Sequence, residues 1–323
     1  MVITNVETSV APGSLDKQIC QRPSARSVIG LPRALEYHRS HRIWKVFFDE
    51  LGYETVSSPE TDAGILRRGA ALSVDESCLA AKIFLGHIDY LKDKCDYILT
   101  PRLCNLGAGE DSCVKFNALP DTARLLADNI LAYNIDYAAG YSMQRAYGDV
   151  GRKLGLSRRR TLDALKAALY EHELDCRQAA SETRKSLAKD NLKILAVGYA
   201  YNIYDKLIGA PVLDYFRKAG AEVIIAGECN CLPELSKNLA RTIYWTHSKQ
   251  LLAAISEHSG NVDGIVLITA FPCGPDSLTN ELIMRKVKKP ILNIVADEHS
   301  SPTGLETRLE SFVDVLQNIS YKI

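Results

Sequence analysis

Three cysteines of this 323-residue chain lie where predicted strands give way to helices, and cysteine at such positions could hold a metal centre. They are Cys78 in SVDESCLAAK, Cys113 in EDSCVKF and Cys273 in FPCGPDSL. In an open α/β sheet, the carboxyl ends of the strands border the crevice where ligands bind. Thiolates gathered there could ligate a soft metal or an iron–sulfur cluster, whereas separately buried thiols would act only as small apolar side chains.

The first half of the chain supplies three candidate ligands: Cys78, Cys113 and an additional cysteine, Cys104. Cys78 opens a predicted helix, where the positive end of the helix dipole would stabilise a thiolate. Cys104 and Cys113 share a long, glycine-containing loop after the predicted strand 96–101, and loops at this end of a sheet tend to carry function. Their spacing does not match a zinc ribbon, so we do not expect a structural zinc ion to join them.

Cys273 follows the predicted strand 264–271 in a turn stiffened by two prolines. Asp276 or Ser277 is expected to cap the helix that begins there. A rigid turn holds a thiol in one direction, which favours Cys273 as a ligand.

The other five of the nine cysteines are weaker candidates. Cys229 and Cys231 in GECNC follow the predicted strand 221–228, so they could serve a second cluster. The remaining three are interpreted as structural or incidental: Cys20, Cys95 and Cys176.

Polar residues follow two further strands. DEHSSPTG comes after the last predicted strand. Its Asp297, Glu298 and His299 could act as acids and bases, but we interpret them as helix-capping and turn residues. GYAYNIYD follows the first strand of the second half and could either hydrogen-bond a ligand or cap the next helix. Its polar residues are Tyr201, Asn202, Tyr204 and Asp205.

Composition and missing motifs exclude several classes of function. Lys+Arg and Asp+Glu number 39 each, so no net charge would attract nucleic acid or anionic lipid. No apolar run reaches the roughly 18 residues of a membrane span, and the N-terminal sequence does not resemble a signal peptide. The phosphate-loop and dinucleotide-binding glycine motifs are absent. We expect a cytoplasmic protein with reduced thiols.

Alternating apolar strands and amphipathic helices predict an α/β protein. We expect two Rossmann-like lobes with mostly parallel, doubly wound sheets, joined by a long helical segment. The expected boundaries are a tail at 1–26, a first lobe at 27–140, the helical segment at 141–190 and a second lobe at 191–323. Within the first lobe, LPDTARLLADNILAY at 119–133 is predicted to form a helix.

Six segments follow one another along the chain: IGLPRAL, SVDESCLAAKIFLGHIDYL, CVKFNALPD, GYAYNIYDKLIGAP, FPCGPDSLTNEL and DEHSSPTGLETRLESFVD. Taken in this order, they resemble proteins related to acyl-CoA dehydratase activases. These proteins are similar in turn to the iron–sulfur subunits of 2-hydroxyacyl-CoA dehydratases, benzoyl-CoA reductases and double-cubane cluster proteins. The resemblance extends over about residues 27–318.

The resemblance implies a [4Fe-4S] cluster, or an [8Fe-9S] double cubane, held by cysteines between the two lobes. Cys78 matches the family's cysteine at the start of a first-lobe helix, and Cys113 matches the cysteine before KFxxLPD. Cys273 matches the cysteine of the FxCGPDS turn. Cys104 is an additional cysteine that could replace or supplement Cys113.

The resemblance also implies a role. The cluster would receive low-potential electrons from an ATP-hydrolysing activator protein and would reduce or activate a small substrate, such as a CoA thioester, under anaerobic conditions. A related dehydratase-type subunit or a second copy of the chain would be a further partner. One alternative is a non-catalytic electron-transfer or cluster-carrying scaffold protein of a larger reductase or dehydratase complex. Another is a small-molecule-binding protein whose cysteines are simply buried.

Overall fold

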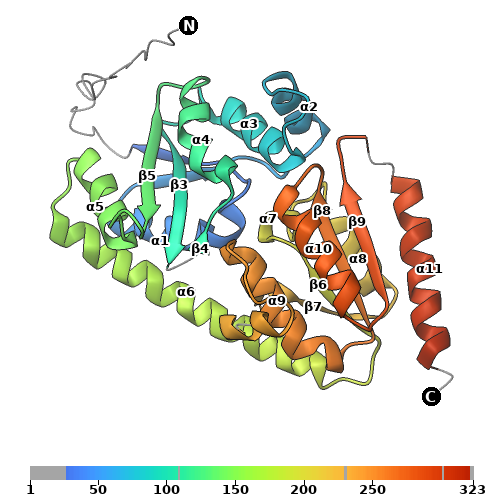
Figure 1. The fold of residues 1–323 in the computed structure, drawn as a ribbon. Helices are drawn as coiled ribbons and strands as arrows, with labels where there is room; N and C mark the ends of the chain where they lie inside the picture. Colours follow the sequence, from blue (N-terminus) through green and yellow to red (C-terminus); the bar gives the residue numbers. More distant parts are fainter. Residues whose placement is uncertain (1–26, 108–109, 229–230, 300–301, 321–323) are drawn as a thin grey trace, which may run out of the picture.

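The computed structural model describes residues 27–107, 110–228, 231–299 and 302–320. Within these ranges the chain forms two α/β lobes, each built on its own sheet of mainly parallel strands, and the two sheets lie side by side (Figure 1). The expected fold class, two Rossmann-like lobes, is therefore confirmed.

The two sheets repeat one topology. In the first, four parallel strands lie in the order β2-β1-β3-β5, and the short β4 pairs antiparallel with the end of β3. In the second, four parallel strands lie in the order β7-β6-β8-β9. The strands are β1 Val28–Leu31, β2 Glu54–Ser57, β3 Tyr97–Gly107, β4 Glu110–Asp111, β5 Ile130–Asp136, β6 Lys193–Val197, β7 Glu222–Ile225, β8 Gly264–Ala270 and β9 Ile291–Ala296.

Because the strand order reverses beside the first strand of each sheet, a crevice is expected at the carboxyl ends of β1 and β3 and of β6 and β8. The chain leaves β3 and β8 towards Cys113 and Cys273, respectively. The helices of the first lobe are α1 Tyr37–Leu51, α2 Ala63–Ala71, α3 Leu79–Leu91, α4 Val114–Arg124 and α5 Met143–Lys153. Those of the second are α7 Ala200–Ile203, α8 Ala210–Lys218, α9 Thr246–His258, α10 Gly274–Lys286 and α11 Pro302–Ser320, with 3-10 turns η1 Ala226–Glu228, η2 Pro233–Asn238 and η3 Ser259–Asn261.

The prediction of one helix over 119–133 is wrong beyond residue 124. The structure begins α4 earlier, directly after Cys113, ends it at Arg124 and forms β5 from Ile130 onward. The run ILAYNID is buried along almost its whole length beside β3, as a strand inside a parallel sheet must be. Over so short a run the apolar residues fit the periodicity of a helix as well as that of a strand. The pairing with β3 is what makes this segment a strand.

The helical segment predicted at 141–190 consists of α5 and the 30-residue α6, Arg158–Leu187, separated by a turn at Gly155 with a positive φ of 73°. The helix α5 packs on β5, whereas α6 contacts α1 of the first lobe and β7 and η1 of the second. It runs alongside both lobes in Figure 1. Arg42 of α1 forms ion pairs with Glu171 and Asp175 of α6.

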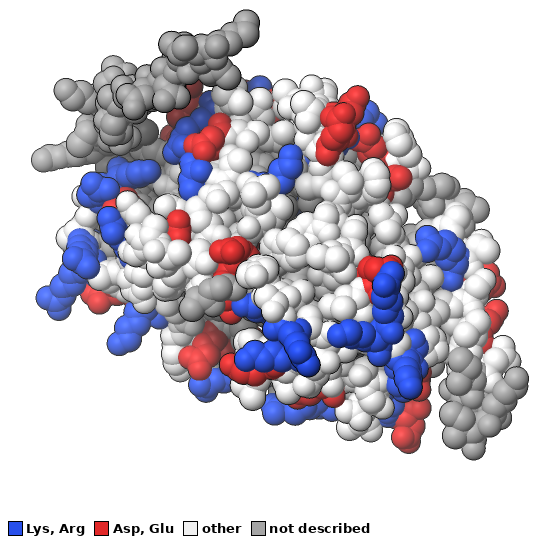
Figure 2. Space-filling view, in the orientation of Figure 1, with Lys and Arg blue, Asp and Glu red and all other residues white. Residues whose placement is uncertain are grey.

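Two features bear on nucleic-acid and membrane binding: the charges on one face of the molecule and the lengths of the apolar helices. On the face drawn in Figure 2, basic and acidic side chains of the described residues are interspersed, without the basic stripe that nucleic-acid binding requires. None of the helices in the described part of the chain combines the length and the apolar run needed to cross a bilayer.

Two glycines allow α2 and α3 to approach closely, and this approach sets the position of Cys78. A Cβ atom at Gly69 of α2 would lie 1.7 Å from the carbonyl oxygen of Lys82, and one at Gly86 of α3 would lie 2.1 Å from that of Ile65. Both obstacles are backbone atoms, so a side chain at either position forces the helices apart.

We therefore expect Gly69→Ala to lower the free energy of unfolding by about 3 kcal/mol, as overpacking of a close helix contact does. Urea denaturation of the purified chain measures this change. Gly148→Ala is the matched control, because no described atom lies within 4 Å of its added Cβ. That control should stabilise the helix by about 0.5–1 kcal/mol. Equal stabilities of the Gly69 variant and wild type would contradict the close packing.

Candidate functional site

The three cysteines predicted to follow strands all lie at the start of a helix. Cys113 follows β4 and Cys273 follows β8, as expected, but Cys78 lies between the helices α2 and α3, so its predicted position directly after a strand is wrong. Cys78 is the N-cap of α3, Cys113 that of α4 and Cys273 that of α10. Each of the three is half-buried. The N-terminus of a helix presents unpaired N–H groups and the positive end of the helix dipole, so each cysteine lies where negative charge is stabilised.

The structure brings these three thiols from two lobes into one neighbourhood. Burial is the main cause that raises the pKa of Cys78, and the nearby Cys113 raises it further. Burial likewise raises the pKa of Cys273, and Asp276, Cys78 and Cys113 add to the effect. The N–H groups of Ala81 and Asp276 act against this by donating hydrogen bonds to the thiols of Cys78 and Cys273.

The backbone joins two of the cysteine positions directly. The N–H of Leu79, next to Cys78, donates a hydrogen bond of 2.8 Å to the carbonyl oxygen of Phe271, two residues before Cys273. The N-terminus of α3 and the turn before α10 are thus held together across the lobes.

The separation of the three thiols limits what they could hold. Among the described residues, Cys231, Glu257 and His258 place three potential ligand atoms within 4.8 Å of one another, whereas the thiols of Cys78, Cys113 and Cys273 do not all lie this close together. Cys78, Cys113 and Cys273 are therefore too far apart to ligate a single ion. A cluster of several irons bridges more widely spaced thiolates, so this donor set fits a cluster better than a mononuclear site.

Cys104 points to a different set of neighbours. It belongs to β3, which continues to Gly107, so the loop predicted after residue 101 is largely strand. Its thiol donates to Oδ1 of Asn117 at 2.5 Å and lies 3.6 Å from Oδ1 of Asn134. Burial raises the pKa of Cys104, and Asp136 adds to the effect. These contacts favour Cys113 over Cys104 as the partner of Cys78 and Cys273.

The weaker cysteine candidates lie elsewhere. Cys95 packs beside β1 and donates to the carbonyl oxygen of Leu91 at 3.4 Å, and burial raises its pKa to about 11. Cys176 is exposed on α6. Cys20 and Cys229 fall outside the described residues.

Asp276 does not cap α10, contrary to expectation. The N-cap is Cys273 itself, and the Ser277 hydroxyl donates to the Cys273 carbonyl oxygen at 2.7 Å. The Asp276 carboxylate is buried and accepts hydrogen bonds from Cys273, Tyr199 and Asn202. Burial raises the pKa of Asp276 to about 7, so this carboxyl group can exchange a proton near neutral pH beside a candidate ligand.

A cavity of about 740 Å³ opens between the lobes next to the cysteines. Its walls come from α1 with the loop before it, from α6, and from the segments after β6 and β7. The three cysteines do not line it. Tyr199 and Tyr201 connect the two regions, since both line the cavity. Burial raises the pKa of both phenols, and Asp276 and the nearby cysteines raise it further.

The cavity wall offers charged groups of both signs and neutral polar groups, and its acidic residues are Glu36, Asp175 and Glu228. Arg39 and Arg42 carry positive charge into it, and Arg39 donates to Oε1 of Gln250 at 3.0 Å. Arg39 also donates to Nδ1 of His247. Burial lowers the pKa of His247 to about 3 and that of His38 to about 4, so both rings are neutral at pH 7. With Phe116, Tyr199 and Tyr201 forming an aromatic wall, this lining suits a small molecule that combines apolar and polar parts.

A buried polar network fixes the two lobes beside the site. The Thr61 hydroxyl donates to Oδ2 of Asp205 at 2.5 Å, so it accepts from Nε2 of His87 at 3.2 Å. On the other side, Lys82 is 5% exposed and pairs with Glu298 at 2.9 Å. Both connections join the first lobe to the second.

Sequence reasoning missed most of these connecting residues. Thr61, Lys82 and His87 belong to no recognisable sequence motif. For Lys82 and His87, the sequence does offer one indication, because both are polar residues within the apolar helical stretch LAAKIFLGHIDYL. The residues after the last strand do serve turn chemistry, because Asp297 accepts from the His299 N–H at 2.8 Å. Glu298 has the further interlobe role.

Comparison with known proteins identifies a family. The family model described as the CoA enzyme activase uncharacterised domain (DUF2229) matches residues 28–227, more than half of the chain. A search of curated proteins finds no match. Among solved structures, the crystal structure of a sugar transporter from Clostridium phytofermentans is similar over 91% of this chain and 93% of that chain, with 11% identity and a TM-score of 0.18. A likeness at that TM-score carries no argument here.

The interlobe network predicts a pH dependence of stability. Nδ1 of His87 is buried without a hydrogen-bond partner among the described residues, and burial lowers the pKa of this ring to about 3. The unfolded chain binds the proton near pH 6.5 and the folded chain does not, so stability falls as the pH drops from 6.5 towards 3. One such group contributes up to about 1.4 kcal/mol per pH unit.

We expect His87→Gln to reduce this acid slope by about 1.4 kcal/mol per pH unit between pH 6 and 5. Urea denaturation at a series of pH values measures the slope. His299→Gln is the control, because its side chain is 85% exposed. A slope that is identical in wild type and the His87 variant would show that the folded protein can protonate His87.

Proposed function

The chain belongs to the family of the CoA enzyme activase uncharacterised domain, and from that premise we propose that it is an iron–sulfur protein whose cluster is shared by the two lobes. Cys78, Cys113 and Cys273 would be the ligands. In this proposal the protein resembles the cluster-binding subunits of 2-hydroxyacyl-CoA dehydratases, benzoyl-CoA reductases and double-cubane cluster proteins. It would receive low-potential electrons from an ATP-hydrolysing activator protein.

The observation that carries the proposal is the meeting of three cysteine-capped helix N-termini from two lobes. Burial disfavours the charged thiolates in the metal-free protein. A bound cation reverses this preference, because ligation takes the deprotonated form. The N–H groups of Ala81 and Asp276, which already donate to Cys78 and Cys273, would stabilise the added negative charge.

When bound, a [4Fe-4S] or [8Fe-9S] cluster supplies one-electron chemistry at low potential. The chain itself would do the rest. The cavity beside Tyr199 and Tyr201 would bind and orient a small substrate, and Arg39 would hold an acidic part of it, such as the phosphates or carboxylate of a CoA thioester. Asp276, with a pKa of about 7, could accept or return a proton next to Cys273.

Exposed apolar side chains next to the candidate ligands support docking of a protein partner. Val74 precedes Cys78 by four residues, Val114 follows Cys113 directly and Phe271 precedes Cys273 by two, and all three are more than half exposed. Exposed apolar residues close in sequence to the ligands of a redox site suit the transient docking of an activator or of a second subunit.

The alternative is a non-catalytic role, in which the cluster only carries electrons within a larger reductase or dehydratase complex. The cavity of about 740 Å³ beside the cysteines favours an enzyme, because a carrier needs no space for a substrate. The two roles differ in one spectroscopic result. Adding a CoA thioester to the reduced protein should change its EPR spectrum if the protein is an enzyme and leave it unchanged if it is a carrier.

We expect about four irons and four sulfides per chain after anaerobic purification, or about eight irons if the centre is a double cubane. Cys78→Ala, Cys113→Ala and Cys273→Ala should each lose most of the iron and the EPR signal of the reduced state, because each removes a ligand. Iron and acid-labile sulfide assays measure the loss.

Cys176→Ala is the matched control, since that exposed cysteine lies on α6 and should keep the full iron content. Cys104→Ala separates the two first-lobe candidates and should also keep its iron if Cys113 is the ligand. Wild-type protein that holds no iron even after anaerobic reconstitution would contradict the proposal. It would leave a two-lobed protein that binds a small molecule.

A further inference from the structure

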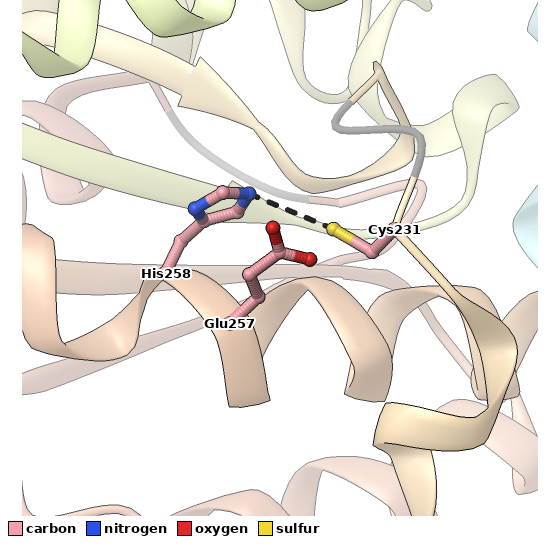
Figure 3. Close-up of side chains that lie close together, drawn as sticks. All are labelled: Cys231, Glu257 and His258. Atoms are coloured by element: carbon pink, nitrogen blue, oxygen red, sulfur yellow. Dashed lines mark hydrogen bonds between the residues drawn. The ribbon is translucent and has the colours of Figure 1, made fainter.

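A second group of potential ligands lies away from the interlobe site. Cys231 belongs to the segment between η1 and η2, whereas Glu257 and His258 end helix α9. One ligand atom from each lies within 4.8 Å of the other two. Figure 3 shows the His258 ring and the Glu257 carboxylate turned towards the Cys231 sulfur.

The spacing of these atoms matches a tetrahedral zinc site. The Sγ of Cys231 lies 3.6 Å from Nε2 of His258. Zinc bonds of about 2.3 Å to sulfur and about 2.0 Å to nitrogen, at a tetrahedral angle, place the two ligand atoms roughly 3.5 Å apart. The sulfur and the nitrogen could therefore ligate one ion with little movement.

The chemistry of the three donors also suits zinc. A thiolate, a neutral imidazole and a carboxylate are the ligand types that zinc takes in proteins. A thiolate and a carboxylate together carry two negative charges, which one Zn²⁺ ion neutralises. Glu257 is exposed and His258 is buried, so the group is open to solvent on one side and rigid on the other.

We propose that Cys231, His258 and Glu257 bind a zinc ion that fastens the segment before η2 to the C-terminal end of α9. A water molecule completes the tetrahedron, and binding releases the proton of the Cys231 thiol. The ion holds the chain that follows β7 against the helix from which His247 and Gln250 reach the cavity. This site is independent of the iron–sulfur cluster, because it shares no ligand with it.

The test is a zinc titration of the full chain, stripped of metal, in competition with a chromophoric chelator. We expect one zinc ion per chain. Cys231→Ala and His258→Ala should weaken zinc binding at least about 100-fold, since even residues that only support a ligand cost 10–100-fold. Glu257→Gln should weaken it about 10-fold or more, and its exposed position keeps loss of folding from explaining the result.

The chain provides a matched control in α6. Cys176 and His172 also place Sγ 3.6 Å from Nε2, but no third ligand completes that pair within 4.8 Å among the described residues. The positive charge of Arg39 also acts on both side chains. Cys176→Ala should therefore bind zinc as tightly as wild type does.

Cobalt substitution gives a second readout. Co²⁺-loaded wild type should show thiolate-to-cobalt charge-transfer absorption that disappears in Cys231→Ala. Zinc binding that is unchanged in Cys231→Ala and Glu257→Gln would overturn the proposal. Zinc that is lost when Cys78, Cys113 and Cys273 are replaced together would also overturn it, by assigning the ion to the interlobe cysteines.

Discussion

The hydrogen bond from the Leu79 N–H to the Phe271 carbonyl oxygen, 2.8 Å long, joins the residue after Cys78 to the turn that carries Cys273. A centre ligated from two lobes requires those lobes to keep one relative position, because a shift of about 1 Å is enough to spoil a ligand set. The Thr61–Asp205 hydrogen bond and the Lys82–Glu298 ion pair restrain the same interface on either side. The rest of the site depends on this fixed contact.

Burial and helix direction act against each other at these cysteines. Partial burial makes thiolates costly in the metal-free chain, whereas three helix N-termini supply the partial positive charge and N–H donors that favour them. The buried Asp276 and Tyr199 and the partly buried Tyr201 extend this environment towards the cavity. Because burial and the helix N-termini have opposite effects on the thiols, a cation that binds there would change their protonation state.

Much of this arrangement could be predicted from the sequence. Apolar strands that alternate with amphipathic helices predicted the two parallel sheets. The positions of Cys113 and Cys273 between a strand and a helix were also predicted, whereas Cys78 lies between two helices. The errors came from pairing: ILAYNID matches a helix or a strand until β3 is placed beside it. Cys104 was predicted to lie in a loop, whereas it belongs to β3. Pairing with β5 and β4 extends this strand beyond the run of apolar residues that predicted it.

The interlobe contacts could not be predicted in the same way. Thr61 and Asp205 are 144 residues apart in the chain, and Lys82 and Glu298 are 216 apart. No periodicity relates such partners, since only the packing of one lobe on the other brings them together. The Cys231–His258 pair, 27 residues apart, likewise depends on how the segment before η2 returns to α9.

The most direct test of the central claim is a crystal structure of the anaerobically purified protein, with diffraction data collected at the iron absorption edge. The account predicts anomalous density for iron between the N-termini of α3, α4 and α10, in contact with Cys78, Cys113 and Cys273. Iron bound at any other place, or protein that contains iron in solution but leaves these three thiols without it in the crystal, would contradict the claim.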